Sequence, residues 1–366
     1  MFVIREFGTA MKKNIMKKTF TILSVFCSVY TFSQDTVKVA VALSPDQQAE
    51  ADYNAGLEQM KKGDHTTAIT FFTKSITAKP DFDKAYYNRA IALTHVKRYP
   101  EAHSDINRVI AKTPQNADYF FTKGLIYFNE NKKDSLLQIL DKCLGLKANH
   151  PEANYYKGMI LYETGEYKQA IESYNKAIEA DPKYVYAYND RASAKRELRD
   201  FNGAISDYEK AITLDDKDDF IYNNLGSAYR DNKNYLKAIE AYDKALQVNP
   251  KYIIAQNNRG ATWLEKGSTK NAQNDFEDVI KKDPTNSSAF NGLASVFIKE
   301  KEYKKATDMA TKAILLNSKN GPAYYNRGIA KQMLRDDTGC CEDWRKALEL
   351  GVTMAKAFIG VDCGHN

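Results

Sequence analysis

Arginine and aspartate recur together along the chain at a constant offset of 16 residues. The four pairs are Arg89 with Asp105, Arg191 with Asp207, Arg259 with Asp275, and Arg327 with Asp343. A planar guanidinium can form two parallel hydrogen bonds with one carboxylate, whereas an ammonium cannot. A charge that enters a packed interface without a partner costs free energy. We therefore predict four structural ion pairs, and a row of catalytic acids is the weaker interpretation.

No other group of side chains has the spacing of a catalytic or metal centre. The histidines are His65, His95, His103, His150 and His365, and no two of them have the spacing of paired metal ligands. The sequence also contains no glycine-rich phosphate loop, nucleophile elbow or HExxH motif. We therefore expect a protein that is not an enzyme and that uses no cofactor or metal ion.

The elements that would position the ion pairs come from a 34-residue unit, which is clearest at Asp219–Tyr252. Within this unit, Tyr222, Leu225 and Tyr229 have the spacing of one face of a helix. A second apolar helical run follows and ends before Pro250, because proline has no backbone donor and disfavours helix at the residue before it. The unit therefore predicts a helix–turn–helix pair with an apolar seam between its two helices.

The unit repeats nine times without insertion from Ala49 to Met354. Its small residue recurs at 34-residue intervals as Gly56, Ala90, Gly124, Gly158, Ala192, Gly226, Gly260, Ala294 and Gly328. After the first copy, new copies begin at Asp83, Ala117, Pro151, Val185, Asp219, Ile253, Ser287 and Gly321. A small residue lets two helices approach closely while aromatic side chains fill the space beside it.

This phased pattern of a large residue, Leu-Gly, Tyr, Ala and Pro resembles the tetratricopeptide-repeat family. The resemblance implies an all-α fold, a right-handed α-solenoid of nine 34-residue repeats over residues 49–354. Each repeat would bury its apolar face against the next one. Residues 355–366 would form a short capping helix and a tail. We expect a packing irregularity in the third repeat, where Leu136 stands at the position of the usual alanine.

Residues 1–33 have the features of an export signal. The positive residues Lys12, Lys13, Lys17 and Lys18 precede the apolar run Phe20–Tyr30. This run is short for a bilayer crossing, so we predict cleavage before Gln34 and no integral membrane span afterwards. We expect a flexible leader over residues 34–48 and an exported protein of the bacterial type, in the periplasm or cell envelope. An uncleaved anchor and a lipoprotein modified at Cys27 are the weaker alternatives.

The net charge of the chain does not favour a nucleic-acid partner. It is +6 for the whole sequence, but residues 1–33 carry five basic side chains against one acidic side chain. The remaining chain is close to neutral, whereas a nucleic-acid-binding domain has a clear basic surplus. We therefore expect no nucleic-acid binding, and the charge says nothing about oligomeric state.

Three cysteines lie near the C-terminus, namely Cys340, Cys341 and Cys363. Cys340 stands at a repeat position that faces its own hairpin, so Cys341 faces the next helix, where Cys363 lies. The run from Cys341 to Gly351, followed by a last cysteine, also resembles the close of exported bacterial tetratricopeptide-repeat proteins. Both observations favour a Cys341–Cys363 disulfide that holds the cap. A zinc site is the rival interpretation, although only one histidine is near.

The resemblance implies that the first helix of each repeat lines a concave groove. Asparagine recurs on this side as Asn54, Asn88, Asn224, Asn258 and Asn326. An amide offers both a donor and an acceptor to the backbone of an extended peptide, so we predict a peptide-binding asparagine ladder. The ladder is interrupted at Thr122, Tyr156, Asp190 and Gly292. The alternative is that these asparagines are ordinary polar surface residues.

The other predicted groove residues change in character along the chain. The aromatic ones are Phe121, Phe128, Tyr155, Tyr156 and Tyr162, and the basic ones that follow are Arg196 and Arg230. We expect a non-enzymatic scaffold that binds a protein or extended peptide in this groove. The alternatives are a cell-envelope assembly component recognised through its convex face and, less favoured, an envelope glycan binder. Aromatic side chains that only pack against one another are the simpler interpretation of the apolar part.

Overall fold

The computed structural model describes residues 43–363. The chain divides into two units, Met1–Ser44 and Pro45–Asn366, and every described helix lies in the second unit. The predicted signal peptide, its cleavage site and most of the leader fall outside the described residues, as do residues 364–366.

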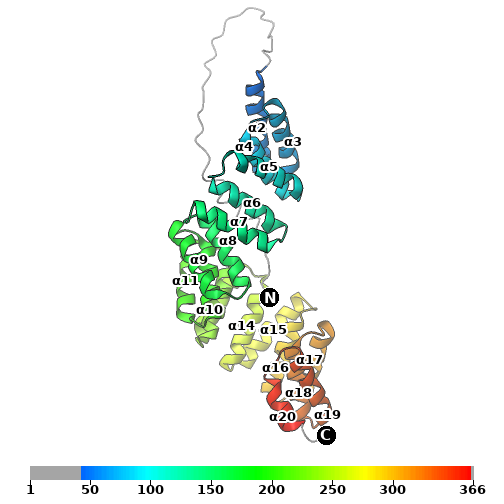
Figure 1. The fold of residues 1–366 in the computed structure, drawn as a ribbon. Coiled ribbons are helices and arrows are strands. Elements are labelled where there is room, and N and C mark those ends of the chain that lie inside the picture. The colour runs from blue at the N-terminus through cyan, green and yellow to red at the C-terminus, as the bar shows by residue number, and fades with distance from the viewer. Residues whose placement is uncertain (1–42, 364–366) are drawn as a thin grey trace, which may run out of the picture. The chain divides into compact units, whose positions relative to one another are not determined.

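The described residues are helical throughout and contain no strand (Figure 1). The first helices of the hairpins are α2 (Pro45–Lys62), α4 (Asp83–His95), α6 (Ala117–Asn129), α8 (Pro151–Glu163), α10 (Val185–Glu197), α12 (Asp219–Asp231), α14 (Ile253–Lys266), α16 (Ser287–Lys299) and α18 (Gly321–Met333). The second helices are α3 (His65–Ala78), α5 (Tyr99–Lys112), α7 (Lys133–Leu146), α9 (Tyr167–Ala180), α11 (Phe201–Leu214), α13 (Tyr235–Val248), α15 (Thr269–Lys282), α17 (Tyr303–Leu316) and α19 (Asp337–Glu349). A last short helix is α20 (Ala355–Asp362).

The hairpins follow the phase of the sequence repeat. From α4 onward, each first helix begins at the residue where the sequence begins a new copy. The first hairpin differs, because α2 begins at Pro45 and residues 45–48 belong to this helix rather than to a leader. Proline is pre-organised for the first helical position, and Ala49 is fully buried and accepts a hydrogen bond from the hydroxyl of Ser75. The predicted boundary of the leader was therefore wrong by four residues.

A residue in the left-handed conformation follows the first helix of every hairpin. The non-glycine residues are Lys97, Asn131, Arg199, Lys233, Lys301 and Arg335, with φ between 59° and 64°. The glycines are Gly63, Gly165 and Gly267. The left-handed residue ends the helix and turns the chain, and it costs a non-glycine residue free energy because its Cβ approaches the backbone.

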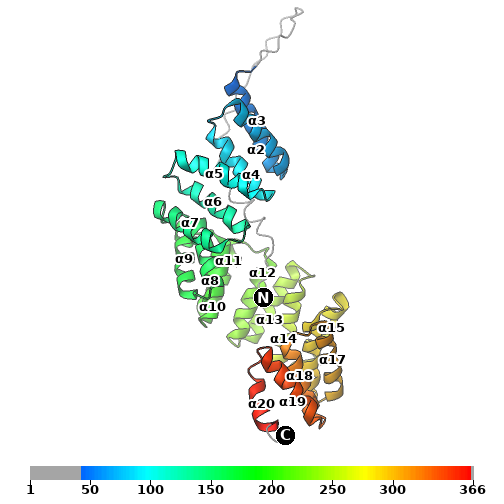
Figure 2. The same ribbon diagram turned by 45° about the vertical axis from the view of Figure 1, so that its right-hand side comes forward.

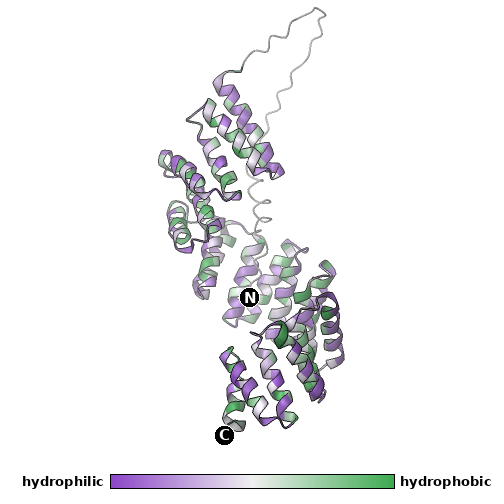
Figure 3. Cartoon of the chain, turned by 90° about the vertical axis from the view of Figure 1, so that its right-hand side faces the viewer, coloured by the Kyte–Doolittle hydropathy of each residue, from purple (hydrophilic) through white to green (hydrophobic). Residues whose placement is uncertain are grey.

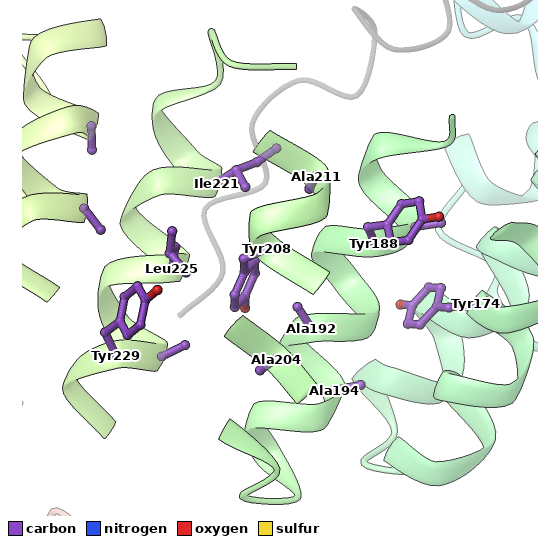
Figure 4. Packing of buried hydrophobic residues seen from close by; sticks show 14 of the residues in the cluster. Tyr174, Tyr188, Ala192, Ala194, Ala204, Tyr208, Ala211, Ile221, Leu225 and Tyr229 are labelled. Atoms are coloured by element: carbon purple, nitrogen blue, oxygen red, sulfur yellow. The ribbon is translucent and has the colours of Figure 1, made fainter. Parts of the chain in front are cut away.

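In six of the nine repeats, the small residue lies beside the aromatic ring of the residue 16 positions later. A Cβ on Gly226 would lie 2.6 Å from the ring of Tyr242, and one on Gly328 would lie 2.4 Å from the indole nitrogen of Trp344. Ala192 lies beside Tyr208, which fills the space between α10 and α12 (Figure 4). The small residues therefore make room for the aromatic packing within these hairpins.

Consecutive helices lie side by side along the chain (Figures 1 and 2). Hydrophobic and hydrophilic residues alternate along the helices (Figure 3). The repeated alanines of the second helices, Ala68, Ala102, Ala170, Ala204, Ala238, Ala272 and Ala306, are fully buried. Burial of one hairpin's apolar side against the next hairpin gives the solenoid its stability.

The third hairpin has Leu136 at the usual alanine position and Leu140 at the position where six other hairpins have an aromatic ring. Leu136, Leu140 and Cys143 are buried there and form a cluster with Ala153 and Ile160 of the next hairpin. A Cβ on Gly124 would lie 3.2 Å from Ile139, so α6 and α7 still approach closely. The packing irregularity that the sequence predicts is therefore a change of core chemistry.

Candidate functional site

Successive first helices are joined by pairs of side chains that lie 35 residues apart. The first member is the fifth residue of one repeat, and the second is the sixth residue of the next repeat. Because these two positions are neighbours on the helix, each first helix extends one side chain toward the following repeat and another toward the preceding repeat. We call the resulting row of contacts the ladder, and each contact a rung.

In the second half of the chain, the rungs are amide–amide hydrogen bonds. The amide nitrogen of Asn224 donates to the amide oxygen of Asn189 at 3.1 Å, and that of Asn258 donates to Asn223 at 2.9 Å. The amide nitrogen of Asn326 donates to the amide oxygen of Asn291 at 2.7 Å and to the hydroxyl of Ser295 at 2.8 Å. At least one N–H of each of these three asparagines is thus already used within the chain.

In the first half, the rungs involve aromatic side chains. The amide of Asn88 donates to the hydroxyl of Tyr53 at 3.1 Å. The hydroxyls of Tyr87 and Thr122 are 2.9 Å apart. The third rung is a ring contact between Phe121 and Tyr156, with centroids 5.7 Å apart and planes at 66°. The predicted gaps at Thr122 and Tyr156 are therefore rungs of a different chemistry.

The rung between the fourth and fifth hairpins contains a carboxylate. The hydroxyl of Tyr155 donates to Oδ2 of Asp190 at 2.8 Å, and the amide of Asn189 donates to Oδ1 at 2.8 Å. Burial raises the pKa of Asp190 to about 6, although the two hydrogen bonds act in the opposite direction. Burial therefore disfavours the charged form of the Asp190 carboxyl.

The rung between the seventh and eighth hairpins is missing because Gly292 has no side chain to meet Asn257. The amide of Asn257 instead donates to Asn286 at 3.3 Å. The ring of Phe276 occupies the space above Gly292, where a Cβ would lie 2.5 Å from it. The ladder is therefore interrupted between α14 and α16.

The structure places the predicted peptide-binding residues at different depths. Asn54 is exposed, whereas Asn224 is 8% exposed. Tyr155 is only 4% exposed and packs on the rings of Tyr174 and Tyr184, so its prediction as a groove contact was wrong. Its side chain turns toward the next first helix because the carboxylate of Asp190 accepts its hydroxyl.

The remaining predicted aromatic residues are partly exposed and pack on other rings. Tyr156 packs edge-on against Phe128, with centroids 5.1 Å apart, as well as against Phe121. Tyr162 packs on Tyr167 at 5.3 Å, and its hydroxyl lies 3.5 Å from Glu197. Phe121, Phe128 and Tyr156 therefore form an aromatic surface on α6 and α8, as the simpler interpretation of the sequence also allowed.

The two predicted basic residues follow on α10 and α12. The side chain of Arg196 is paired with Asp231 of the next first helix, with Nε and Oδ2 3.2 Å apart. Arg230 is partly exposed and lies near Tyr242, and its positive charge counteracts the rise in the pKa of Tyr242 that burial causes. Arg196 and Arg230 therefore lie one repeat apart on consecutive first helices.

The structure brings together the two members of all four Arg–Asp pairs. Nε and one terminal nitrogen of each guanidinium bond the two oxygens of the aspartate, in pairs Arg89–Asp105, Arg191–Asp207, Arg259–Asp275 and Arg327–Asp343. The four aspartates are 3–5% exposed. Hydrogen bonding to Asp105 and to Asp343 raises the pKa of Arg89 and of Arg327, despite partial burial.

Each of these arginines also reaches the preceding hairpin, which the sequence interpretation missed. The second terminal nitrogen of Arg89, Arg191, Arg259 and Arg327 donates to Thr73, Asn175, Asp243 and Thr311, respectively, 16 residues earlier. Lys123 and Lys157 occupy the same repeat position and donate to Asn107 and Asp141 at 2.8 Å. The signal that could have revealed these contacts is a polar residue 16 positions before each cation.

A disulfide joins Cys341 of α19 to Cys363, directly after α20. Phe358 of α20 packs on Trp344 and on Tyr325, with centroids 4.9 and 5.7 Å apart. Cys340 is buried, and its thiol donates to the carbonyl of Asp337. The disulfide and the ring contacts together hold the short helix over the last hairpin.

The described residues contain no cluster of three or more side chains that could bind a metal ion. Over the same range, no helix combines the length and apolar character that a bilayer crossing requires.

Known proteins share both the sequence pattern and the fold. Sequence models of the tetratricopeptide repeat match residues 53–117, 158–198, 185–218 and 220–252. A model described as anaphase-promoting complex, cyclosome, subunit 3 matches residues 106–177.

Curated relatives match only part of the chain. The chain is 29% identical over 151 residues to Tetratricopeptide repeat protein 13 of Homo sapiens, a match that covers 40% of this chain and 17% of that protein. It is 26% identical over 155 residues to the Hsp70-Hsp90 organizing protein of Triticum aestivum, covering 38% of this chain and 27% of the relative. The matches therefore span less than a third of either relative.

Two crystal structures support the fold assignment. A tetratricopeptide repeat protein from Parabacteroides merdae aligns with a TM-score of 0.61 at 20% identity, over 68% of this chain and 100% of that chain. The APC/C hetero-tetramer Cut9-Hcn1 aligns with a TM-score of 0.53 at 16% identity, over 78% of this chain and 59% of that chain. At these identities the likeness concerns the fold alone.

Proposed function

The chain is a tetratricopeptide-repeat protein, and from this premise we propose that it is a non-enzymatic scaffold that binds a protein or an extended peptide along the ladder. The observation that carries the proposal is the row of rungs, which holds one set of side chains per repeat in register along the first helices. An extended peptide presents a donor and an acceptor at regular intervals, which suits such a row. The remaining N–H and oxygen atoms of the ladder amides would bind the peptide backbone, and the aromatic surface on α6 and α8 would receive apolar side chains.

The ladder amides provide a direct test with a matched control. The double variant Asn224→Ala/Asn258→Ala removes two rung donors, and Asn271→Ala/Asn274→Ala removes two exposed amides from the second helix α15. We expect the purified chain to bind a subset of an array of mixed ten-residue peptides. The ladder variant should bind that subset several-fold more weakly, while the α15 variant binds it normally. Unchanged binding by a folded ladder variant would contradict the proposal.

A second candidate is recognition through the second helices, by an assembly partner. Two leucines on these helices are unusually exposed, Leu236 of α13 at 60% and Leu315 of α17 at 80%. Exposed large apolar side chains are typical of contact surfaces when they gather in patches. Replacing both leucines with serine should leave peptide binding intact, and it should abolish partner binding only if this candidate is correct.

We also propose that the protein is exported to the periplasm or the cell envelope. Residues 1–33 support this location through their sequence, and the disulfide supports it because disulfides persist in oxidising compartments. Mass spectrometry of the protein from a fractionated bacterial host should find a chain that begins at Gln34 outside the cytoplasm. A full-length chain retained in the cytoplasm would contradict this location.

A further inference from the structure

Asp190 is the rung residue whose charge has no counter-ion. Both oxygens accept hydrogen bonds, from the neutral groups of Tyr155 and Asn189, and a partly buried carboxylate stabilised only by neutral donors remains costly. In the part of the chain that the structure describes, no lysine, arginine or histidine lies within ion-pair distance of Asp190.

The cations of the neighbouring first helices are occupied elsewhere. On α10, Arg191 and Lys195 both bond Asp207, and Arg196 bonds Asp231. On α8, Lys157 bonds Asp141 of α7. These cations point toward other carboxylates, so the missing charge at Asp190 has no source on the two helices that form its rung.

The surroundings of Asp190 are aromatic. The rings of Tyr155 and Tyr184 lie 4.8 Å apart, and Tyr156 packs edge-on against Tyr155 at 5.7 Å. Burial, followed by the charge of Asp190 and other neighbours, raises the pKa of Tyr155. Burial and nearby charges, including that of Asp190, likewise raise the pKa of Tyr184. Tyr156 and Tyr184 are partly exposed, and both pack on the ring of Tyr155, whose hydroxyl bonds the carboxylate.

We propose that Asp190 receives a lysine or arginine side chain of the bound peptide, and that Tyr156 and Tyr184 pack against this side chain. A carboxylate supplies the counter-charge, and aromatic faces attract cations and cover the aliphatic stem. This inference rests on the proposed peptide-binding function and names the chemistry of one anchor. In this arrangement, the fourth and fifth hairpins bind a cationic side chain of the peptide, and the amide rungs that follow bind the peptide backbone.

The experiment uses the purified full chain and matched ten-residue peptides that carry lysine, arginine, glutamine, leucine or glutamate at each position in turn. We expect the wild-type chain to prefer lysine or arginine over glutamine by about fivefold or more at one position. The variant Asp190→Asn keeps the shape of the side chain and should reduce the ratio to about one. The control Glu179→Gln removes an equal charge from an exposed position on α9 and should keep the preference.

Acetylation of the peptide lysine offers a second measurement that needs no variant. It removes the cation, so it should weaken binding to the wild-type chain about as much as Asp190→Asn does. The inference is overturned if the wild-type chain binds lysine and glutamine peptides equally, or if Asp190→Asn retains the preference. Peptide binding that depends on Asn224 and Asn258 but shows no cationic preference would overturn this inference alone. Peptide binding that ignores the ladder would overturn the proposed function as well.

Discussion

Arg259 bonds carboxylates on two different second helices. It bonds Asp275 of its own hairpin through Nε at 2.9 Å and Asp243 of the preceding hairpin through a terminal nitrogen at 2.6 Å. Asp275 is 5% exposed, so it depends on this guanidinium for its counter-charge.

Removal of this guanidinium should destabilise the fold. We expect Arg259→Leu to lower the free energy of unfolding by about 3 kcal/mol, because a buried carboxylate is left without its partner. Arg98→Leu is the control, since Arg98 and Glu101 form an exposed pair whose loss should change stability much less. Urea unfolding followed by circular dichroism measures both. Equal effects of the two substitutions would contradict the structural role of the buried pair.

The left-handed turn residues predict a stabilising substitution. Lys233 has φ of 59°, so Lys233→Gly should relieve the clash of its Cβ and raise stability by as much as about 1 kcal/mol. Gly267 occupies the equivalent turn one repeat later, with φ of 94°. The substitution Gly267→Ala should lower stability by a similar amount. Thermal unfolding of the two variants should therefore shift in opposite directions. A lower midpoint for Lys233→Gly would show that its side-chain contacts outweigh the backbone cost.

The carboxylate of Asp190 predicts a pH dependence. Burial raises the pKa of Asp190 to about 6 in the folded state. The protonated carboxyl therefore contributes to folding stability in full below about pH 4, and this contribution is lost as the pH rises through about 6. The tyrosines that sense its charge, namely Tyr155, Tyr174, Tyr184, Tyr186 and Tyr208, do not titrate in this range, because burial raises the pKa of each one further. The thermal unfolding midpoint of Asp190→Asn, measured relative to the wild-type chain, should therefore be higher at pH 7 than at pH 4. We expect this difference to grow by about 2 °C or more between the two pH values. A midpoint difference that stays constant with pH would contradict the raised pKa.

The disulfide predicts a redox effect confined to the C-terminal end. The bond closes a segment with a sequence separation of 22 residues, and loops of this size contribute about 3 kcal/mol in the chain-entropy view. Reduction, or Cys341→Ser, should speed hydrogen exchange in α19 and α20 and leave α8 to α12 unchanged. The control Cys143→Ser changes a buried thiol of the third hairpin and should not alter the response to reductant. Exchange in α20 that is insensitive to reductant would show that Phe358 and its ring contacts hold the helix alone.

The sequence predicted the contacts that lie within one hairpin. The phase of the helices follows from the 34-residue repeat, and the pairing of Arg259 with Asp275 follows from an offset that two antiparallel helices bring together. These features depend on local geometry, which a single repeat already contains.

The contacts between hairpins were harder to predict, because they depend on how far each hairpin is rotated against the next. The rungs at 35 residues and the backward contacts at 16 residues both arise from this rotation. Tyr155 was wrongly placed on the surface for the same reason, since its side chain turns toward Asp190 of the next repeat. Complementary chemistry at the offset of 35 residues, such as Tyr53 with Asn88, is the signal that could have revealed the ladder.

The arginines and lysines that reach back to the preceding hairpin divide the solenoid into blocks. Leu225 and Leu293 stand at this repeat position in the sixth and eighth hairpins, so no such cation joins α12 to α11 or α16 to α15. The fifth and sixth hairpins are still joined by the ion pair of Arg196 with Asp231, whereas an opening fluctuation between the seventh and eighth hairpins separates α15 from α16 without breaking a charge pair. The molecule should therefore open first between the seventh and eighth hairpins.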